Sequence, residues 1–359
     1  MKEAVSWNDI ERELQSYTFP DKENETVVFG TGLLGQVITP ALLEEDLRIT
    51  AFCDNDEQKW GTEIHGLPCV APQKLKEYKK PFALVAAIKY HVDISRQLSE
   101  MGIPCCTADA YVVRENLSRF HEVYRMLDAN SRDIYAKVLL CRIRGDLTGV
   151  RDICTDHQYF ALPEFRYCGC GEVFVDCGAY TGEIIQTFIN NVSGMFRKIY
   201  AFELNSAALE AMKRRLSYER DMWLFSDDQI VFEHKVMAKE GGLNVPVYID
   251  QANAMSSFTQ ETIGKRTEER GETTSLDQYF ENKTVTFLKA DIEGSEWNML
   301  LGGAKTIQIN KPKIAICIYH NIYDFFRIPL LLRKWVPEYR FAVRHHWNSF
   351  DETVLYCYV

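Results

Sequence analysis

The stretch FLKADIEGSEWNMLLGGAKTI, residues 287–307, decides how the fold of this chain is interpreted. It begins as the end of an apolar strand and continues into two carboxylates, Asp291 and Glu293. A helical segment that we expect to bury Trp297 follows them. Open α/β sheets bind their ligands at the carboxyl ends of the strands. The stretch therefore predicts a strand end that delivers acidic side chains into a cleft.

A glycine-containing strand end, VFVDCGAYTG at 173–182, lies upstream in the same half. Two glycines remain in its loop, a spacing that fits S-adenosylmethionine better than a dinucleotide, because this cofactor has no pyrophosphate. Glu203 ends the next predicted strand, where its carboxylate can accept both ribose hydroxyl protons. Asp176 is expected to hold the loop amides or, through water, the methionine ammonium. The candidate cofactor-binding residues are Asp176, Gly178, Ala179, Tyr180, Gly182, Glu203, Asn205 and Asp291.

Composition limits the class of protein. A chain of 359 residues with 46% hydrophobic and 26% charged residues is typical of about two globular domains. The formal net charge of −10 disfavours nucleic acid as a partner and leaves a small molecule or glycan as the expected substrate. Neither a secretory signal nor a membrane span is recognisable, so a cytoplasmic location with reduced cysteines is expected. The sequence does not indicate an oligomeric state.

Strand and helix patterns alternate along the chain, which predicts an α/β fold with two Rossmann-like parallel-sheet domains. The expected divisions are a first domain over 1–110, a helical connector over 111–165 that packs on the second domain, and a second domain over 166–359. Ser131 is a candidate cap for a helix of the connector. The two terminal apolar runs, 340–343 and 353–359, predict an antiparallel hairpin at the edge of the second sheet.

The first domain contains a GxGxxG pattern between a predicted strand and helix. Gly30, Gly32 and Gly35 form it, Leu33 lies within it, and Asp54 ends the next strand. This is the pattern of a dinucleotide site, with a pyrophosphate at the helix N-terminus and a carboxylate on a ribose. A Rossmann-like fold that binds another nucleotide, or none, remains the alternative.

The second half resembles the FkbM family of S-adenosylmethionine-dependent methyltransferases. The resemblance covers roughly 115–359, and Tyr180 departs from it where many members carry Asn. The residues that carry it are VDCGAYTG (175–182), YAFELN (200–205), SLDQYF (275–280), FLKADIEGSE (287–296), LLGGAKTI (300–307), IYH (318–320) and RHHWNSFDETVLYCYV (344–359). It implies a methyltransferase fold for this domain and methylation of a hydroxyl on a sugar, glycan or related secondary metabolite.

The first domain also resembles known proteins. Residues VVFGTGLLG (27–35) and AFCDNDEQKWGTEIHGLPCV (51–70) are similar to the nucleotide-sugar-binding domain of sugar acetyltransferases. This resemblance implies a nucleotide sugar as a second ligand.

Methyl transfer to a hydroxyl needs a group that takes the proton, and the candidates are His320, Asp291 and Glu293. Histidine titrates near neutral pH, which favours His320. Glu293 is alternatively a cap of the helix that begins near Ser295. A divalent metal on these three residues is the less favoured alternative, so no metal is predicted.

Three further residues have weaker assignments. Asp277 is expected to be a helix cap, and His345 and His346 are candidates for the substrate mouth. Two alternative functions stay open: a non-catalytic nucleotide-sugar-binding protein and, less favoured, an NAD-dependent oxidoreductase. The sequence lacks an identifiable hydride-transfer partner, which argues against the second.

Overall fold

The computed structural model separates into two compact units, and each is described by itself. The residues it describes are 4–45, 47–250, 256–257 and 266–359. The first unit comprises Met1–Cys154, Tyr319–Arg327 and Trp347–Glu352. The second unit comprises Thr155–Ile318, Ile328–His346 and Thr353–Val359.

The first unit is built on a six-stranded sheet in the order β3-β4-β2-β1-β5-β6. Its strands are β1 (Glu25–Phe29), β2 (Ile49–Cys53), β3 (Glu63–Ile64), β4 (Leu67–Val70), β5 (Pro81–Val85) and β6 (Cys105–Thr107). β1 pairs in parallel with β2 on one side and β5 on the other. The parallel sheet expected from strands β1, β2 and β5 is confirmed. The short strands β3, β4 and β6 had no recognisable pattern in the sequence.

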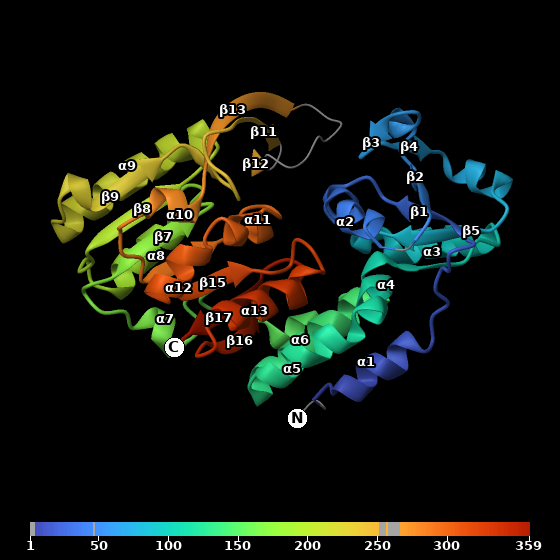
Figure 1. Ribbon diagram of the computed structural model, residues 1–359, viewed down its shortest axis with the longest axis horizontal. Helices are drawn as coiled ribbons and strands as arrows, with labels where there is room; N and C mark the ends of the chain where they lie inside the picture. Colours follow the sequence, from blue (N-terminus) through green and yellow to red (C-terminus); the bar gives the residue numbers. More distant parts are fainter. Residues whose placement is uncertain (1–3, 46, 251–255, 258–265) are drawn as a thin grey trace. The chain divides into compact units, whose positions relative to one another are not determined.

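Helices complete the first unit (Figure 1). They are α1 (Trp7–Leu14), α2 (Leu33–Leu43), α3 (His91–Glu100), α4 (Ala108–Glu115), α5 (Leu117–Met126) and α6 (Ala129–Arg144). Residues 111–154 of the expected connector lie in the first unit and residues 155–165 in the second, and the packing of the connector on the second domain stays a prediction. Ser131 does not cap α6. Asp128 does, since its side chain accepts a hydrogen bond from the Ser131 amide at 2.8 Å.

The second unit is built on a seven-stranded sheet in the order β16-β17-β15-β14-β7-β8-β9. Its strands are β7 (Val173–Cys177), β8 (Lys198–Phe202), β9 (Ile230–Glu233), β14 (Phe287–Ala290), β15 (Lys313–Cys317), β16 (Arg340–His345) and β17 (Thr353–Tyr358). The strands from β15 to β9 run parallel, whereas β17 is antiparallel to both β15 and β16. The predicted α/β class and its terminal hairpin are confirmed.

A separate four-stranded sheet, ordered β10-β13-β11-β12, was not predicted. It consists of β10 (Lys235–Met237), β11 (Asn244–Asp250), β12 (Ser256–Ser257) and β13 (Arg266–Thr274). The predicted strand at 245–249 exists, but it pairs antiparallel with β13 rather than joining the parallel sheet. The sequence RTEERGETT of β13 is too polar to indicate a buried strand, which explains why it was missed.

Aromatic side chains fix a helix of the second unit on its sheet. The Phe188 ring of α8 (Glu183–Asn191) lies 4.6 Å from Phe174 on β7, and Phe174 lies 4.8 Å from Phe287 on β14, measured between ring centroids. All three are buried, so they hold β7 and β14 in a rigid core.

The helices of the second unit are α7 (Pro163–Arg166), α8 (Glu183–Asn191), α9 (Ser206–Trp223), α10 (Leu276–Tyr279), α11 (Glu296–Leu301), α12 (Ala304–Asn310) and α13 (Asp324–Trp335), the last with residues in both units.

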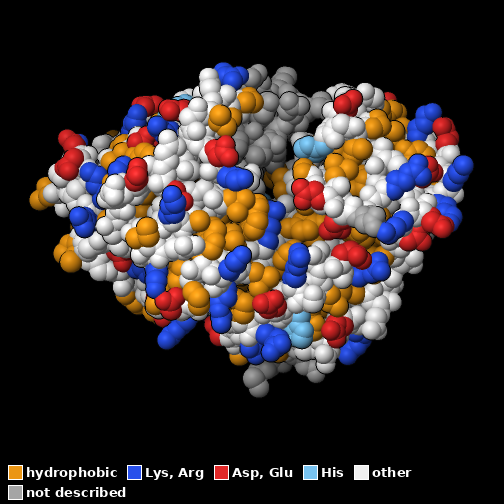
Figure 2. Space-filling model, in the orientation of Figure 1, with side chains coloured by type: hydrophobic (Ala, Val, Ile, Leu, Met, Phe, Trp, Pro, Cys, Tyr) orange, Lys and Arg blue, Asp and Glu red, His pale blue; other side chains and the backbone are white. Residues whose placement is uncertain are grey.

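Charges of both signs are interspersed on the face shown in Figure 2, without a continuous basic surface there. Among the described residues, no helix is both long enough and apolar enough to cross a membrane.

Candidate functional site

The glycine loop after β7 fits closely against the chain that follows β14. Gly178 has φ +82°, and a Cβ on it would lie 1.9 Å from the Asp291 carbonyl oxygen. Gly182 has φ +85°, a conformation that other residues rarely adopt. Ala179 is buried, whereas Tyr180 is 46% exposed with φ +47°. The two glycines are therefore required by the loop itself, and the Tyr180 side chain points away from the core.

Asp176, the last polar residue of β7, forms a buried ion pair with Lys289 of β14. Parallel pairing of the two strands sets these residues opposite each other. Lys289 Nζ lies 2.9 Å from Asp176 Oδ1 and donates to the Gly178 carbonyl oxygen at 2.7 Å. Asp176 is fully buried, so Lys289 is a direct partner that the sequence did not indicate.

Burial and charge act in opposite directions on this pair. Burial raises the pKa of Asp176 to about 6, although the Lys289 ammonium lowers it. Burial alone would lower the pKa of Lys289, but Asp176 and Asp291 together raise it above its ordinary value. Lys289 thus stays cationic and ties the base of the glycine loop to the strand beside it.

Glu203 follows β8 and connects the glycine loop to α9. Its Oε2 accepts a hydrogen bond from the Tyr180 amide at 2.6 Å, and its Oε1 accepts one from the Asn205 amide at 2.7 Å. Burial raises the pKa of Glu203, and these backbone donors oppose the rise. A carboxylate has about four acceptor positions, so Glu203 retains capacity for a ligand's hydroxyl groups. Asn205 caps α9 through the Ala207 and Ala208 amides.

Asp291, which follows β14, is held by a residue that the sequence did not reveal. The Tyr159 hydroxyl donates to Asp291 Oδ2 at 2.7 Å. Tyr159 is buried with φ +63°, and the Lys289 ammonium lies 5.1 Å from the centre of its ring. Tyr159 belongs to no recognisable motif and precedes Asp291 by 132 positions, so only the folded chain brings them together.

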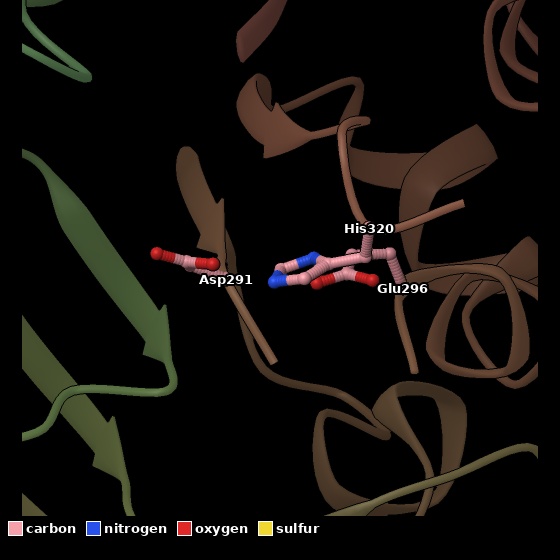
Figure 3. Close-up of side chains that lie close together, drawn as sticks. All are labelled: Asp291, Glu296 and His320. Atoms are coloured by element: carbon pink, nitrogen blue, oxygen red, sulfur yellow. The ribbon is translucent and has the colours of Figure 1, made fainter. Parts of the chain in front are cut away.

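The acids after β14 divide into different roles. α11 begins at Glu296, which is fully buried and accepts a hydrogen bond from the Ile292 amide at 2.8 Å. Glu296 thus binds the backbone of the loop between β14 and α11, whereas the cap role of Glu293, which is half-buried with φ +54°, stays a prediction. Trp297 is likewise only half-buried. Figure 3 shows the side chains of Asp291 and Glu296.

His320, also drawn in Figure 3, comes from the segment Tyr319–Arg327 of the first unit. It is buried, and it follows β15 by three residues. Because β15 lies parallel to β14, both chains leave the sheet at the same edge. That His320 faces the Asp291 side chain stays a prediction.

The two other histidines named from the sequence, His345 and His346, contact residues of β17 in the terminal hairpin. His345 is fully buried, with its Nδ1 2.8 Å from Thr353 Oγ1, so its expected place at a substrate mouth is wrong. The ring of His346 bridges the Thr155 carbonyl oxygen and the Tyr356 hydroxyl. Asp277 is a cap as expected, but of α12, whose Lys305 and Thr306 amides donate to its carboxylate.

The glycine loop of the first unit has the tight packing that its pattern predicts. A Cβ on Gly35 would lie 2.0 Å from the Gly30 carbonyl oxygen, and Gly30 itself has φ +113°. Asp54 Oδ2 accepts hydrogen bonds from the Thr31 amide and hydroxyl, and Lys59 Nζ lies 3.1 Å from it. Asp54 thus has protein partners on the oxygen that was expected to bind a ribose.

Two protein-family models match this chain, one in each half. Residues 176–344 match the model of the methyltransferase FkbM domain. Residues 22–106 match a different model, described as C2185-like, N-terminal. No curated protein matches the chain.

Solved structures add a likeness in fold. A methyltransferase FkbM from Methylobacillus flagellatus KT is 19% identical with a TM-score of 0.59, covering 98% of this chain and 99% of that one. An rRNA methylase from Streptococcus thermophilus is 14% identical with a TM-score of 0.30, covering 59% and 91%. Aeropyrum pernix fibrillarin with bound S-adenosyl-L-methionine is 10% identical with a TM-score of 0.33, covering 55% and 70%. TM-scores as low as the last two establish no shared overall fold. The glycine loop, Glu203 and the acids after β14 all lie within residues 176–344, the part of the chain that matches the model of the methyltransferase FkbM domain.

Proposed function

We propose that the second unit transfers a methyl group from S-adenosylmethionine to a hydroxyl oxygen of a sugar, glycan or related secondary metabolite. The observation that carries the cofactor assignment is Glu203. Its two oxygens are fixed by the amides of Tyr180 and Asn205, so the carboxylate is oriented before any ligand arrives. A carboxylate held in this way suits a pair of ribose hydroxyls.

The residues of the loop fit this cofactor class. The half-exposed Tyr180, Gly178 packed on the Asp291 backbone, and Glu203 are the residues that would hold the cofactor beside the end of β14. S-adenosylmethionine would supply an electrophilic methyl group at that edge. Lys289 and Asp176 do not contact the cofactor in this proposal. They fix the glycine loop to strands β7 and β14.

The chain's own groups then position the acceptor and remove its proton. Asp291, oriented by the Tyr159 hydroxyl, and His320, which follows the neighbouring strand β15, are the candidates. A base in this position contributes about 10²–10⁴-fold to the rate. Holding the hydroxyl in line contributes more, up to about 7–11 kcal/mol in favourable cases.

The acceptor class rests on resemblance. Residues 27–35 and 51–70 are similar to nucleotide-sugar-binding domains, which supports a carbohydrate context for the hydroxyl. An assay with S-adenosylmethionine labelled in the methyl group, run against sugars, sugar nucleotides, polyketide alcohols and carboxylic acids, tests the proposal. Label in an alkali-stable ether on a sugar is the expected result. Label only in a base-labile ester would overturn the hydroxyl assignment.

A further inference from the structure

The first unit contains a cavity of about 350 Å³, and His320, a candidate base of the proposed methyl transfer, is among its lining residues. Its walls are formed by the start of α2, the segment that follows β5, and three later segments of the same unit, which contribute Arg142, Tyr319–His320 and Phe350–Asp351. The lining residues named in the argument are Gly32, Leu33, Lys89, Tyr90, Arg142 and Phe350. All of them belong to the first unit, so the cavity does not depend on how the two units are placed.

The cavity lies at the point of the sheet where ligands bind most often. β1 is the strand from which the order turns: β2 lies on one side of it and β5 on the other. The segments that leave the carboxyl ends of β1 and β5 line the cavity. In open α/β sheets the crevice at such a switch point is the usual ligand site. A volume of this size is at the small end of ligand pockets, below that expected for an extended dinucleotide.

Gly32 is the observation that favours a ligand site over a mere gap in the packing. Gly30 and Gly35 are explained by the protein, since a Cβ on either would crowd backbone atoms. Gly32 has an ordinary φ of −72°, and a Cβ on it would meet no described atom within 4 Å. Neither backbone conformation nor packing requires glycine there. A ligand that approaches the backbone closely at the cavity wall would account for it.

The charges at the cavity favour an anionic group. α2 begins at Leu33 with no side-chain cap and no acid in its first turn, so its first amides face the ligand position with the positive end of the helix dipole. Lys89 is an exposed cation on the lining. Arg142 is buried in the wall, bonded to Asp109 at 2.8 Å and to the Tyr319 carbonyl oxygen at 3.1 Å. Asp351 is the one acid among the lining residues, and it is exposed.

We infer that this cavity binds a small organic phosphate of the size of a sugar phosphate or a mononucleotide. Its phosphate lies on the first amides of α2 beside Lys89, and its body packs on Leu33, Tyr90 and Phe350. Asp54 does not line the cavity, and its Oδ2 already accepts from Thr31 and pairs with Lys59. The site therefore lacks the ribose acceptor of a dinucleotide site. A ligand in this cavity would lie beside His320, but the inference itself rests on Gly32, Lys89 and the start of α2 and not on the role of that histidine.

Titration calorimetry on the full chain tests it, with UMP, glucose 1-phosphate, inorganic phosphate, NAD and the unphosphorylated uridine and glucose as probes. We expect at least one phosphate ester to bind, at least tenfold more tightly than its unphosphorylated counterpart and than inorganic phosphate. Gly32→Val should weaken that ester at least tenfold with little change in melting temperature. Gly169→Val is the matched control, because a Cβ on Gly169 also meets open space without a positive φ, and Gly169 does not line the cavity.

Lys89→Gln, an exposed change that folding tolerates, should weaken the ester several-fold and flatten the dependence of affinity on salt. Absence of binding by both esters would overturn the inference, as would unchanged affinity in Gly32→Val. If inorganic phosphate bound as tightly as the esters, the apolar side chains of the cavity would add nothing to the affinity, which would contradict their proposed role. Preferential binding of NAD would replace the assignment with a dinucleotide site.

Discussion

Lys289 and Asp176 form an ion pair of 2.9 Å between two neighbouring strands of the second sheet, and both side chains are buried. Lys289 also donates to the Gly178 carbonyl oxygen, so one ammonium links β14, β7 and the glycine loop. Removing one partner of such a pair leaves an uncompensated charge in the interior, which costs more than the pair contributes.

Lys289→Met should therefore lower the free energy of unfolding by about 3–5 kcal/mol, measured by urea denaturation. Asp176→Asn should cost less on its own, because it leaves Lys289 able to donate to Gly178. The double variant should be less destabilised than the sum of the two, which is the sign of direct coupling. A strictly additive double variant would show that the two residues act separately.

Tyr159→Phe removes the donor that orients Asp291. A hydrogen bond to a charged group is worth about 1.5–3 kcal/mol, so kcat should fall about tenfold or more while the Michaelis constant for S-adenosylmethionine changes little. Tyr339→Phe is the control: its hydroxyl donates to the Pro312 carbonyl oxygen at 2.7 Å, also in the interior. Equal losses of activity in both variants would mean that Tyr159 supports the structure and has no special effect on Asp291.

Two further variants test which residue is the base. If His320 accepts the proton, His320→Ala lowers turnover by about 10²-fold or more, and the limb of the pH–rate profile that a histidine base produces near neutrality disappears. If Asp291 is the base, Asp291→Asn gives the large loss and His320→Ala is mild. Full turnover in both would mean that neither residue removes the proton. Affinity for S-adenosylhomocysteine should survive His320→Ala in every case.

His346 predicts a pH dependence of stability. Burial lowers the pKa of His346 to about 4, from 6.5. Between these values the unfolded chain holds a proton that the folded chain does not, so stability falls as pH falls from about 6.5 through 4. The contribution approaches about 1.4 kcal/mol per pH unit. Urea denaturation between pH 4 and 7 should show a shallower decline in His346→Gln than in the unmodified chain. Parallel declines would contradict the role of this histidine.

Sequence reasoning located the strands and the two glycine loops because these depend on local patterns. The apolar runs of β1, β7, β8 and β15 lie where they were expected, and the glycines of both loops except Gly32 have the positive φ or the close packing that their spacing implies. The four-stranded sheet was missed because its longest strand, β13, is polar and carries no alternating apolar pattern.

The site was less predictable, since its contacts join distant segments. Asp176 and Lys289 were both within recognised motifs, but their pairing depends on the register of β14 against β7. Tyr159 lies in a loop with no motif, and only the fold places it on Asp291. The start of the helix near Ser295 was predicted correctly, but the buried position of Glu296 and its bond to the Ile292 amide depend on the fold of the loop after β14.

The central claim is that the glycine loop and Glu203 form a site for S-adenosylmethionine, and calorimetric titration with S-adenosylhomocysteine tests it most directly. The product should bind to the unmodified chain and, at 100 times its dissociation constant, stabilise the fold by about 2.7 kcal/mol. Glu203→Gln should weaken binding by at least 1 kcal/mol, roughly fivefold. Glu210→Gln, an exposed change on α9, should leave it unchanged. No detectable binding by a chain shown to be folded, or equal affinity in Glu203→Gln, would contradict the account.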